Sequence, residues 1–80
     1  MASVVSQTLA IELLAAGEEG VVVDVDGNSG LVIRLEEMGL HAGARVRMIQ
    51  PGSPSILEIN HQRYSIRFED SVTVLVDVAR

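Results

Sequence analysis

The stretch RLEEMGLHAGARVRMIQ, residues 34–50, joins a helical pattern to a strand pattern. Its first residues complete an apolar stripe at helical spacing, formed by Leu31, Leu35 and Met38. Its last residues alternate apolar and charged side chains, which is typical of a strand with one buried face. The stretch therefore predicts a helix over residues 31–38, a turn and then a strand.

Gly39 and Gly43 lie between these two patterns. Glycine readily adopts a positive φ, so Gly39 predicts a left-handed helix cap, and Gly43 predicts a second reversal of the chain. Such a turn either projects Leu40 and His41 outward beside Arg34, or uses Leu40 to plug the end of the core. We expect the first arrangement, in which Arg34, Leu40 and His41 form part of a partner-binding surface.

Alternating runs elsewhere in the chain predict further strands. GVVVDVDG predicts a strand whose buried face is formed by Val21, Val23 and Val25. ILEINHQ and RYSIRF predict an antiparallel hairpin that turns near Gln62 and Arg63, and SVTVLVDV predicts the last strand. Five short strands of this kind shield a core only when they close on themselves, so the sequence predicts a small antiparallel barrel.

The N-terminal segment LAIELLAAG has leucines at helical spacing before Gly17. We expect a short helix or helical turn there, capped by Ser6 or Thr8. The N-terminus has no basic leader and carries Glu12 within its apolar part, so it fits neither a secretory signal nor a membrane span of about 20 apolar residues. We therefore expect a cytoplasmic protein without direct membrane insertion.

Composition limits the classes of function. The 80 residues are enough for a single domain, residues 1–80, and 48% of them are hydrophobic, so apolar packing can stabilise the fold without cysteine. The net charge is -5, and the aromatic residues are one Tyr and one Phe. Nucleic-acid binding relies on basic side chains and on aromatic stacking, so we expect no nucleic-acid partner.

The sequence resembles the FeoA family, small cytosolic proteins of bacterial ferrous iron uptake. The resemblance lies within residues 9–78 and is carried by LLAAGEEGVVVDV, IRLEEMGLHAGARVRMI, PGSPSILEI and YSIRF. Its most specific positions follow the family's recurring pattern in the middle element: Arg34, Leu35, Met38, Gly39, Leu40, Gly43 and Val46. Two positions depart from the pattern. His41 and Ala42 stand where a Thr-Pro pair is frequent, and Arg63 stands where the late hairpin turn usually has glycine.

The resemblance implies a mainly β fold, a five-stranded antiparallel SH3-like barrel with one or two short helices. It also implies a non-enzymatic accessory protein that binds the cytosolic part of FeoB, a membrane transporter with a GTPase domain, and modulates it. An alternative is a metal-sensing regulatory domain, because the same barrel resembles the C-terminal domain of iron-dependent repressors; the sequence shows no helix-turn-helix before it. Direct iron chaperoning would require more ligands than two histidines.

His41 and His61 are the candidate metal ligands, and Glu36, Glu37 or Glu58 could complete a shell around iron or zinc. Their spacing matches no ligand motif, and the chain has no thiolate. We therefore favour a solvated His41 and a partly packed His61, and expect at most weak metal binding.

Two further patterns could indicate chemistry. GNSG, residues 27–30, is glycine-rich like a phosphate-binding loop, but it lacks the Gly-Lys-Ser/Thr ending, so we favour a strand-to-helix connection. Serine, histidine and aspartate are present without catalytic spacing or a glycine-flanked nucleophile. We expect no catalytic residues.

Overall fold

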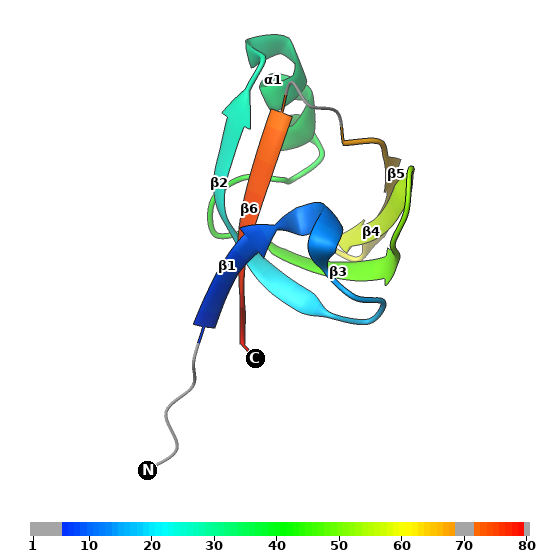
Figure 1. Ribbon diagram of the computed structural model, residues 1–80. Coiled ribbons are helices and arrows are strands. Elements are labelled where there is room, and N and C mark those ends of the chain that lie inside the picture. Colours follow the sequence, from blue (N-terminus) through cyan, green and yellow to red (C-terminus); the bar gives the residue numbers. More distant parts are fainter. Residues whose placement is uncertain (1–5, 69–71, 80) are drawn as a thin grey trace.

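The computed structural model describes residues 6–68 and 72–79 and is mainly β (Figure 1). The described elements are β1 (Ser6–Ala10), the 3-10 helix η1 (Ile11–Leu13), β2 (Glu19–Gly27), α1 (Ser29–Glu37), β3 (Arg45–Gln50), β4 (Ser55–Ile59), β5 (Gln62–Ile66) and β6 (Val72–Ala79). The strands form one antiparallel sheet in the order β1-β6-β2-β3-β4-β5. The predicted antiparallel fold is confirmed, with six strands instead of five. Ser71, where the last strand was expected to begin, and residues 1–5 lie outside the described residues.

β2 curves the sheet because it belongs to both of its halves. Residues 19–21 pair with β3, and residues 21–27 pair with β6, with a register shift between Val22 and Asp24. An irregularity of this kind bends a strand and increases its twist. In Figure 1, β3, β4 and β5 therefore run across β1 and β6 and enclose the apolar side of the sheet.

β2 buries the face opposite to the predicted one. Val22 is 1% exposed and Gly20 is buried, whereas Val21 and Val23 are 37% and 40% exposed and Val25 is half-buried. The prediction that Val21, Val23 and Val25 form the buried face is therefore wrong. The barrel still has a core on this strand, because Gly20 and Val22 are buried instead. Successive valines occupy both faces here, and local sequence does not set the register of such a strand.

The N-terminal prediction is only partly confirmed. A helical turn exists as η1, but its N-cap residue Ala10 has no side-chain capping bond, so the predicted cap by Ser6 or Thr8 is wrong. Residues Ser6–Ala10 form a strand instead, in register with β6 from Ser6 opposite Ala79 to Ala10 opposite Leu75. Thr8 donates a hydrogen bond to the carboxylate of Asp77 on β6. Pairing with a distant strand outweighs the local helical spacing.

The hairpin of β4 and β5 turns two residues earlier than predicted. Asn60 and His61 have φ of 51° and 66°, and Ile59 pairs with Gln62. Two consecutive positive φ values are the mark of a tight two-residue hairpin turn, for which asparagine is well suited. The predicted turn at Gln62 and Arg63 is therefore wrong.

α1 confirms the predicted helix. Leu35 is buried, and Leu31 and Met38 are half-buried on the same stripe. The side-chain oxygen of Asn28 accepts hydrogen bonds from the backbone nitrogens of Gly30 at 3.1 Å and Leu31 at 3.3 Å, which caps the helix. Residues 27–30 thus connect a strand to a helix, as we favoured over a phosphate-binding loop.

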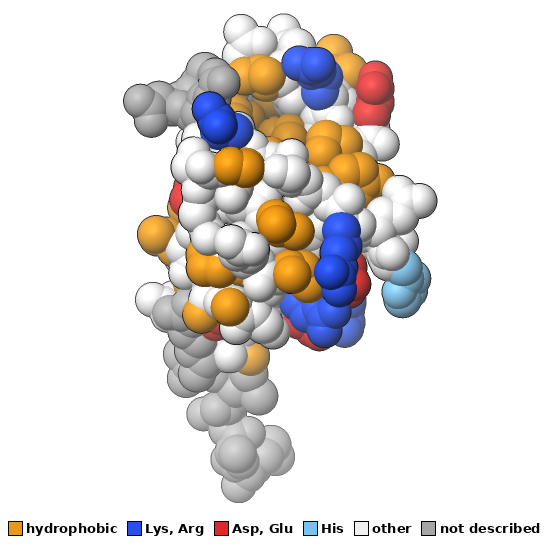
Figure 2. All heavy atoms as spheres, turned by 90° about the vertical axis from the view of Figure 1, so that its right-hand side faces the viewer, with side chains coloured by type: hydrophobic (Ala, Val, Ile, Leu, Met, Phe, Trp, Pro, Cys, Tyr) orange, Lys and Arg blue, Asp and Glu red, His pale blue; other side chains and the backbone are white. Residues whose placement is uncertain are grey.

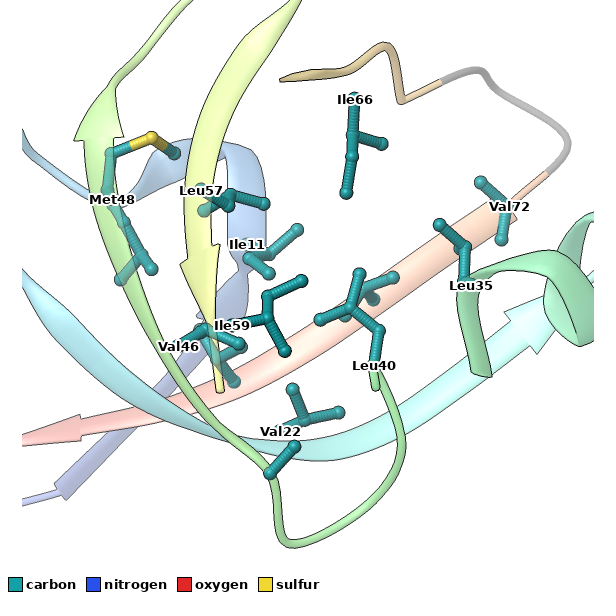
Figure 3. Close-up of a cluster of buried hydrophobic side chains, with 14 of the residues drawn as sticks. Ile11, Val22, Leu35, Leu40, Val46, Met48, Leu57, Ile59, Ile66 and Val72 are labelled. Atoms are coloured by element: carbon teal, nitrogen blue, oxygen red, sulfur yellow. The ribbon is translucent and has the colours of Figure 1, made fainter. Parts of the chain in front are cut away.

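The core lies between the two halves of the sheet and extends toward α1 (Figure 3). Burying one large apolar side chain contributes about 1.5–3 kcal/mol, so this cluster can stabilise a chain that has no disulfide. Its members are Ile11, Leu14, Val22, Leu35, Leu40, Ala44, Val46, Met48, Leu57, Ile59, Ile66, Val72, Val74, Val76 and Val78.

Candidate functional site

The junction after α1 is a glycine-capped helix end. Gly39 has a φ of +99°, and its N–H donates to the carbonyl of Glu36 at 2.9 Å. The N–H of Leu40 donates to the carbonyl of Leu35 at 2.9 Å, which completes a Schellman motif. The predicted left-handed cap at Gly39 is confirmed.

The loop that follows is bonded to β2. Gly43, with a φ of +93°, donates its N–H to the carbonyl of Val22 at 2.7 Å. The N–H of Val22 donates in return to the carbonyl of Ala44 at 2.9 Å. This reciprocal pair holds the loop against the strand, so the predicted reversal at Gly43 is confirmed.

Leu40 does not project outward. Its side chain is 0% exposed and points into the cluster, where Figure 3 shows it between Ile59 and Leu35. The expectation of an exposed Leu40 is wrong, and the alternative, that it plugs the end of the core, is correct. In a Schellman motif the residue after the glycine commonly packs against the last turn of the helix.

Of the predicted surface residues, Arg34 and His41 are exposed. His41 lies on the loop, with its ring Nδ1 3.2 Å from the carbonyl oxygen of Ala42. Arg34 lies in the last turn of α1 and lines a hollow that neither Leu40 nor His41 lines. The structure therefore separates the three residues that the sequence suggested as one surface.

That hollow, which we name the α1–β5 groove, has a volume of about 180 Å³ and lies where α1 faces the end of β5 and the start of β6. Its floor is apolar, and the arginines Arg34 and Arg67 are exposed. Figure 2 views this side of the molecule and shows apolar side chains gathered beside arginines near the top. The described lining residues are Leu31, Arg34, Leu35, Met38, Ser65, Ile66, Arg67, Phe68 and Val72.

Sequence reasoning missed the part of this groove that follows β5. In RYSIRF, Ile66 and Phe68 fall on the same side of the alternation, and Ile66 is buried. β5 ends at Ile66, however, and Phe68 stays half-buried at the groove. The sequence shows Phe68 as an aromatic residue beside Arg67, but only the fold places these two residues next to α1.

A second hollow, of about 290 Å³, is lined mostly by polar and charged residues and includes His61. It also contains Arg47 and Glu58, which face each other across β3 and β4 and form an ion pair with 3.2 Å between Nη2 and Oε1. His61 is exposed in the hairpin turn, so its expected partial packing is wrong. Glu58 already has a cationic partner, which makes it a poor metal ligand.

Metal ligands are not gathered in the described part of the chain. Residues 6–68 and 72–79 contain no group of three or more histidine, aspartate or glutamate side chains that could hold an ion. His41 and His61 are exposed, and neither belongs to such a group. The expectation of weak iron or zinc binding is consistent with this arrangement.

Within the described residues, no helix has both the length and the apolar character needed to cross a bilayer.

Comparison with known proteins adds to this geometry. Residues 9–78 match the FeoA domain. The chain belongs to the FeoA family. The chain is similar to a crystal structure of an FeoA that is described as an iron uptake regulatory protein. The TM-score is 0.81 and the sequence identity is 23%, and the match covers 90% of this chain and 100% of that one. At this identity the likeness shows the shared fold.

The zinc complex of Stenotrophomonas maltophilia FeoA is also similar, with a TM-score of 0.76 and 26% identity, over 86% of this chain and 89% of that one. That protein is described as a prokaryotic SH3 domain protein and as a candidate activating factor of ferrous iron transport. The SH3-like fold predicted for this FeoA chain is confirmed. The chain matches no curated protein sequence.

Proposed function

We propose that this FeoA-family protein is a non-enzymatic accessory protein of ferrous iron uptake, which binds the cytosolic region of a FeoB-type transporter and modulates its activity. The observation that carries the proposal is the family match over residues 9–78. The description of the S. maltophilia relative as a candidate transport activating factor supports it. In this role the protein acts in the cytoplasm and reaches the inner face of the membrane through its partner.

The α1–β5 groove is the surface that best fits such a partner. Apolar side chains in a depression flanked by polar ones are typical of docking sites, and this groove has two exposed arginines beside its apolar floor. The contact surface proposed from the sequence therefore keeps Arg34. Leu40 is buried in the core and His41 is exposed on the loop after α1, so neither lines this groove.

A metal-sensing regulatory domain is the second candidate. The zinc complex of the S. maltophilia relative favours it. Because the described residues of this chain gather no three-ligand group, a sensing site here would need ligands from another molecule. We therefore rank this candidate below transporter binding.

Co-purification tests the proposed function. The tagged protein is mixed with the purified cytosolic region of the FeoB-type transporter from the same cells, and with the whole transporter in detergent. We expect a stoichiometric complex and a changed rate of GTP hydrolysis. Absence of a complex with both preparations would refute the proposal.

A further inference from the structure

The described lining of the α1–β5 groove has a charge that contrasts with the net charge of the chain. The chain has a net charge of -5, yet two of its six basic residues, Arg34 and Arg67, line this one hollow, and none of its described lining residues is acidic. Within residues 6–68 and 72–79, neither guanidinium has a carboxylate at ion-pair distance. Glu69 and Asp70, which stand between the lining residues Phe68 and Val72 in the sequence, are outside the described residues. The described part of the groove offers two guanidinium groups to carboxylates of another molecule.

The size of the groove indicates what fits inside it. Pockets for drug-sized small molecules are usually about 300–1,000 Å³. This hollow of about 180 Å³ is smaller, and its apolar floor suits an aliphatic side chain. A peptide segment that inserts one or two apolar side chains fits better than a free small molecule.

The outer edge of β5 borders this hollow. β5 is the last strand in the sheet order, so no described strand pairs with its outer side. In a two-residue hairpin the closing pair, here Ile59 and Gln62, exchanges both hydrogen bonds, and the next outward-facing positions are therefore Arg63 and Ser65. Ser65 also lines the groove, so a strand added at this edge would lie beside the apolar floor.

We propose that the groove binds an extended acidic segment of the partner. The segment adds to the outer edge of β5 through the backbone of Arg63 and Ser65, places an apolar side chain on the groove floor, and pairs its carboxylates with Arg34 and Arg67. This inference rests on the proposed function, in which the transporter's cytosolic region supplies the segment. Backbone pairing provides affinity, and the two arginines select acidic sequences.

A second copy of the chain is the competing occupant. Leu13 is 66% exposed on η1 beside the exposed Glu12, which is also an acidic and apolar surface. η1 is a 3-10 turn rather than a strand, however, and cannot extend the edge of β5. An extended acidic segment of the partner would use the outer edge of β5, the apolar floor and both arginines, so we favour it.

Charge reversal tests the proposal on the complex. We compare Arg34→Glu and Arg67→Glu with Arg45→Glu, an equal charge change at an exposed arginine outside the groove, in binding to the transporter's cytosolic region. Each groove variant should weaken the complex about tenfold, with greater loss at low salt, while the control stays within about twofold. Ser65→Pro, which removes an outward N–H from the edge, should weaken it as well. Equal affinities for groove and control variants would refute the inference while leaving transporter binding intact.

A peptide titration tests the groove inference even if the transporter's cytosolic region does not bind the protein. A short peptide alternating glutamate with leucine is added to the isotopically labelled protein, and a matched peptide with lysine in place of glutamate serves as control. We expect amide resonances of α1, Ser65 and Arg67 to shift with the acidic peptide alone. No shift at millimolar peptide, or equal shifts with both peptides, would overturn the inference. Concentration-dependent shifts of the same resonances without peptide, lost in Leu13→Asp, would assign the groove to a second copy and overturn it as well.

Discussion

Replacing Gly39 by alanine should lower the free energy of unfolding by about 2–5 kcal/mol. Part of this loss is backbone strain, because a residue with a Cβ at the φ of +99° costs about 1–2 kcal/mol. The rest is overlap with the β4–β5 hairpin. An added Cβ would lie 2.9 Å from Nδ2 of Asn60 and 3.0 Å from Cγ2 of Ile59, whereas carbon atoms pack at about 3.5–4.0 Å. Ile59 is 0% exposed and cannot move away freely, so overpacking adds about 1–3 kcal/mol.

Two other glycines provide matched controls for this prediction. Gly43 has a similar φ of +93°, but a Cβ there would meet nothing within 4 Å, so Gly43→Ala should show the strain alone, about 1–2 kcal/mol. Gly30 lies in the first turn of α1, so Gly30→Ala should be neutral or stabilise by up to about 1 kcal/mol. Urea unfolding followed by circular dichroism measures all three, and the slope of the free energy with urea should stay unchanged. A Gly39→Ala cost no larger than that of Gly43→Ala would refute the reasoning.

Two further predictions concern the core and the metal. Leu40→Ala should lower the free energy of unfolding by about 2–5 kcal/mol, because it truncates a fully buried side chain. Thermal melts should show a clear fall in Tm, and an unchanged Tm would contradict the burial of Leu40. Calorimetry with ferrous iron and with zinc should show only weak binding to the isolated chain, because the described residues hold no three-ligand group. His41→Ala and His61→Ala should change this binding little. A tight stoichiometric site that is lost in either variant would contradict the prediction and favour the metal-sensing role.

The helix and the cap were predictable because their causes are local. The apolar stripe of α1 follows the helical repeat, and its end depends on one residue, Gly39, that adopts a positive φ without a Cβ. β3 was predictable for a similar reason, since Val46 and Met48, which alternate with Arg45 and Arg47, are its buried residues. Each of these elements has a single local arrangement that satisfies its pattern.

The errors at β1, β2 and Leu40 have a common origin in contacts between distant residues. β1 forms because Ser6 lies opposite Ala79, and no local pattern contains that pairing. β2 has valine on both faces, so the choice of Val22 for the core depends on its register with β6. The direction of Leu40 was equally open, because a capped turn allows either the surface or the core.

The candidate site shows most clearly the difference between what local sequence determines and what contacts between distant residues determine. The sequence by itself determined that Arg34 is an exposed helical arginine, and the resemblance of its surrounding motif indicated the FeoA family. Only the tertiary structure brought Arg34 together with Arg67 and Phe68 around one apolar hollow. Helix and strand patterns are set by interactions within a few residues, whereas a groove between two elements exists only after the sheet has curved and brought their ends together.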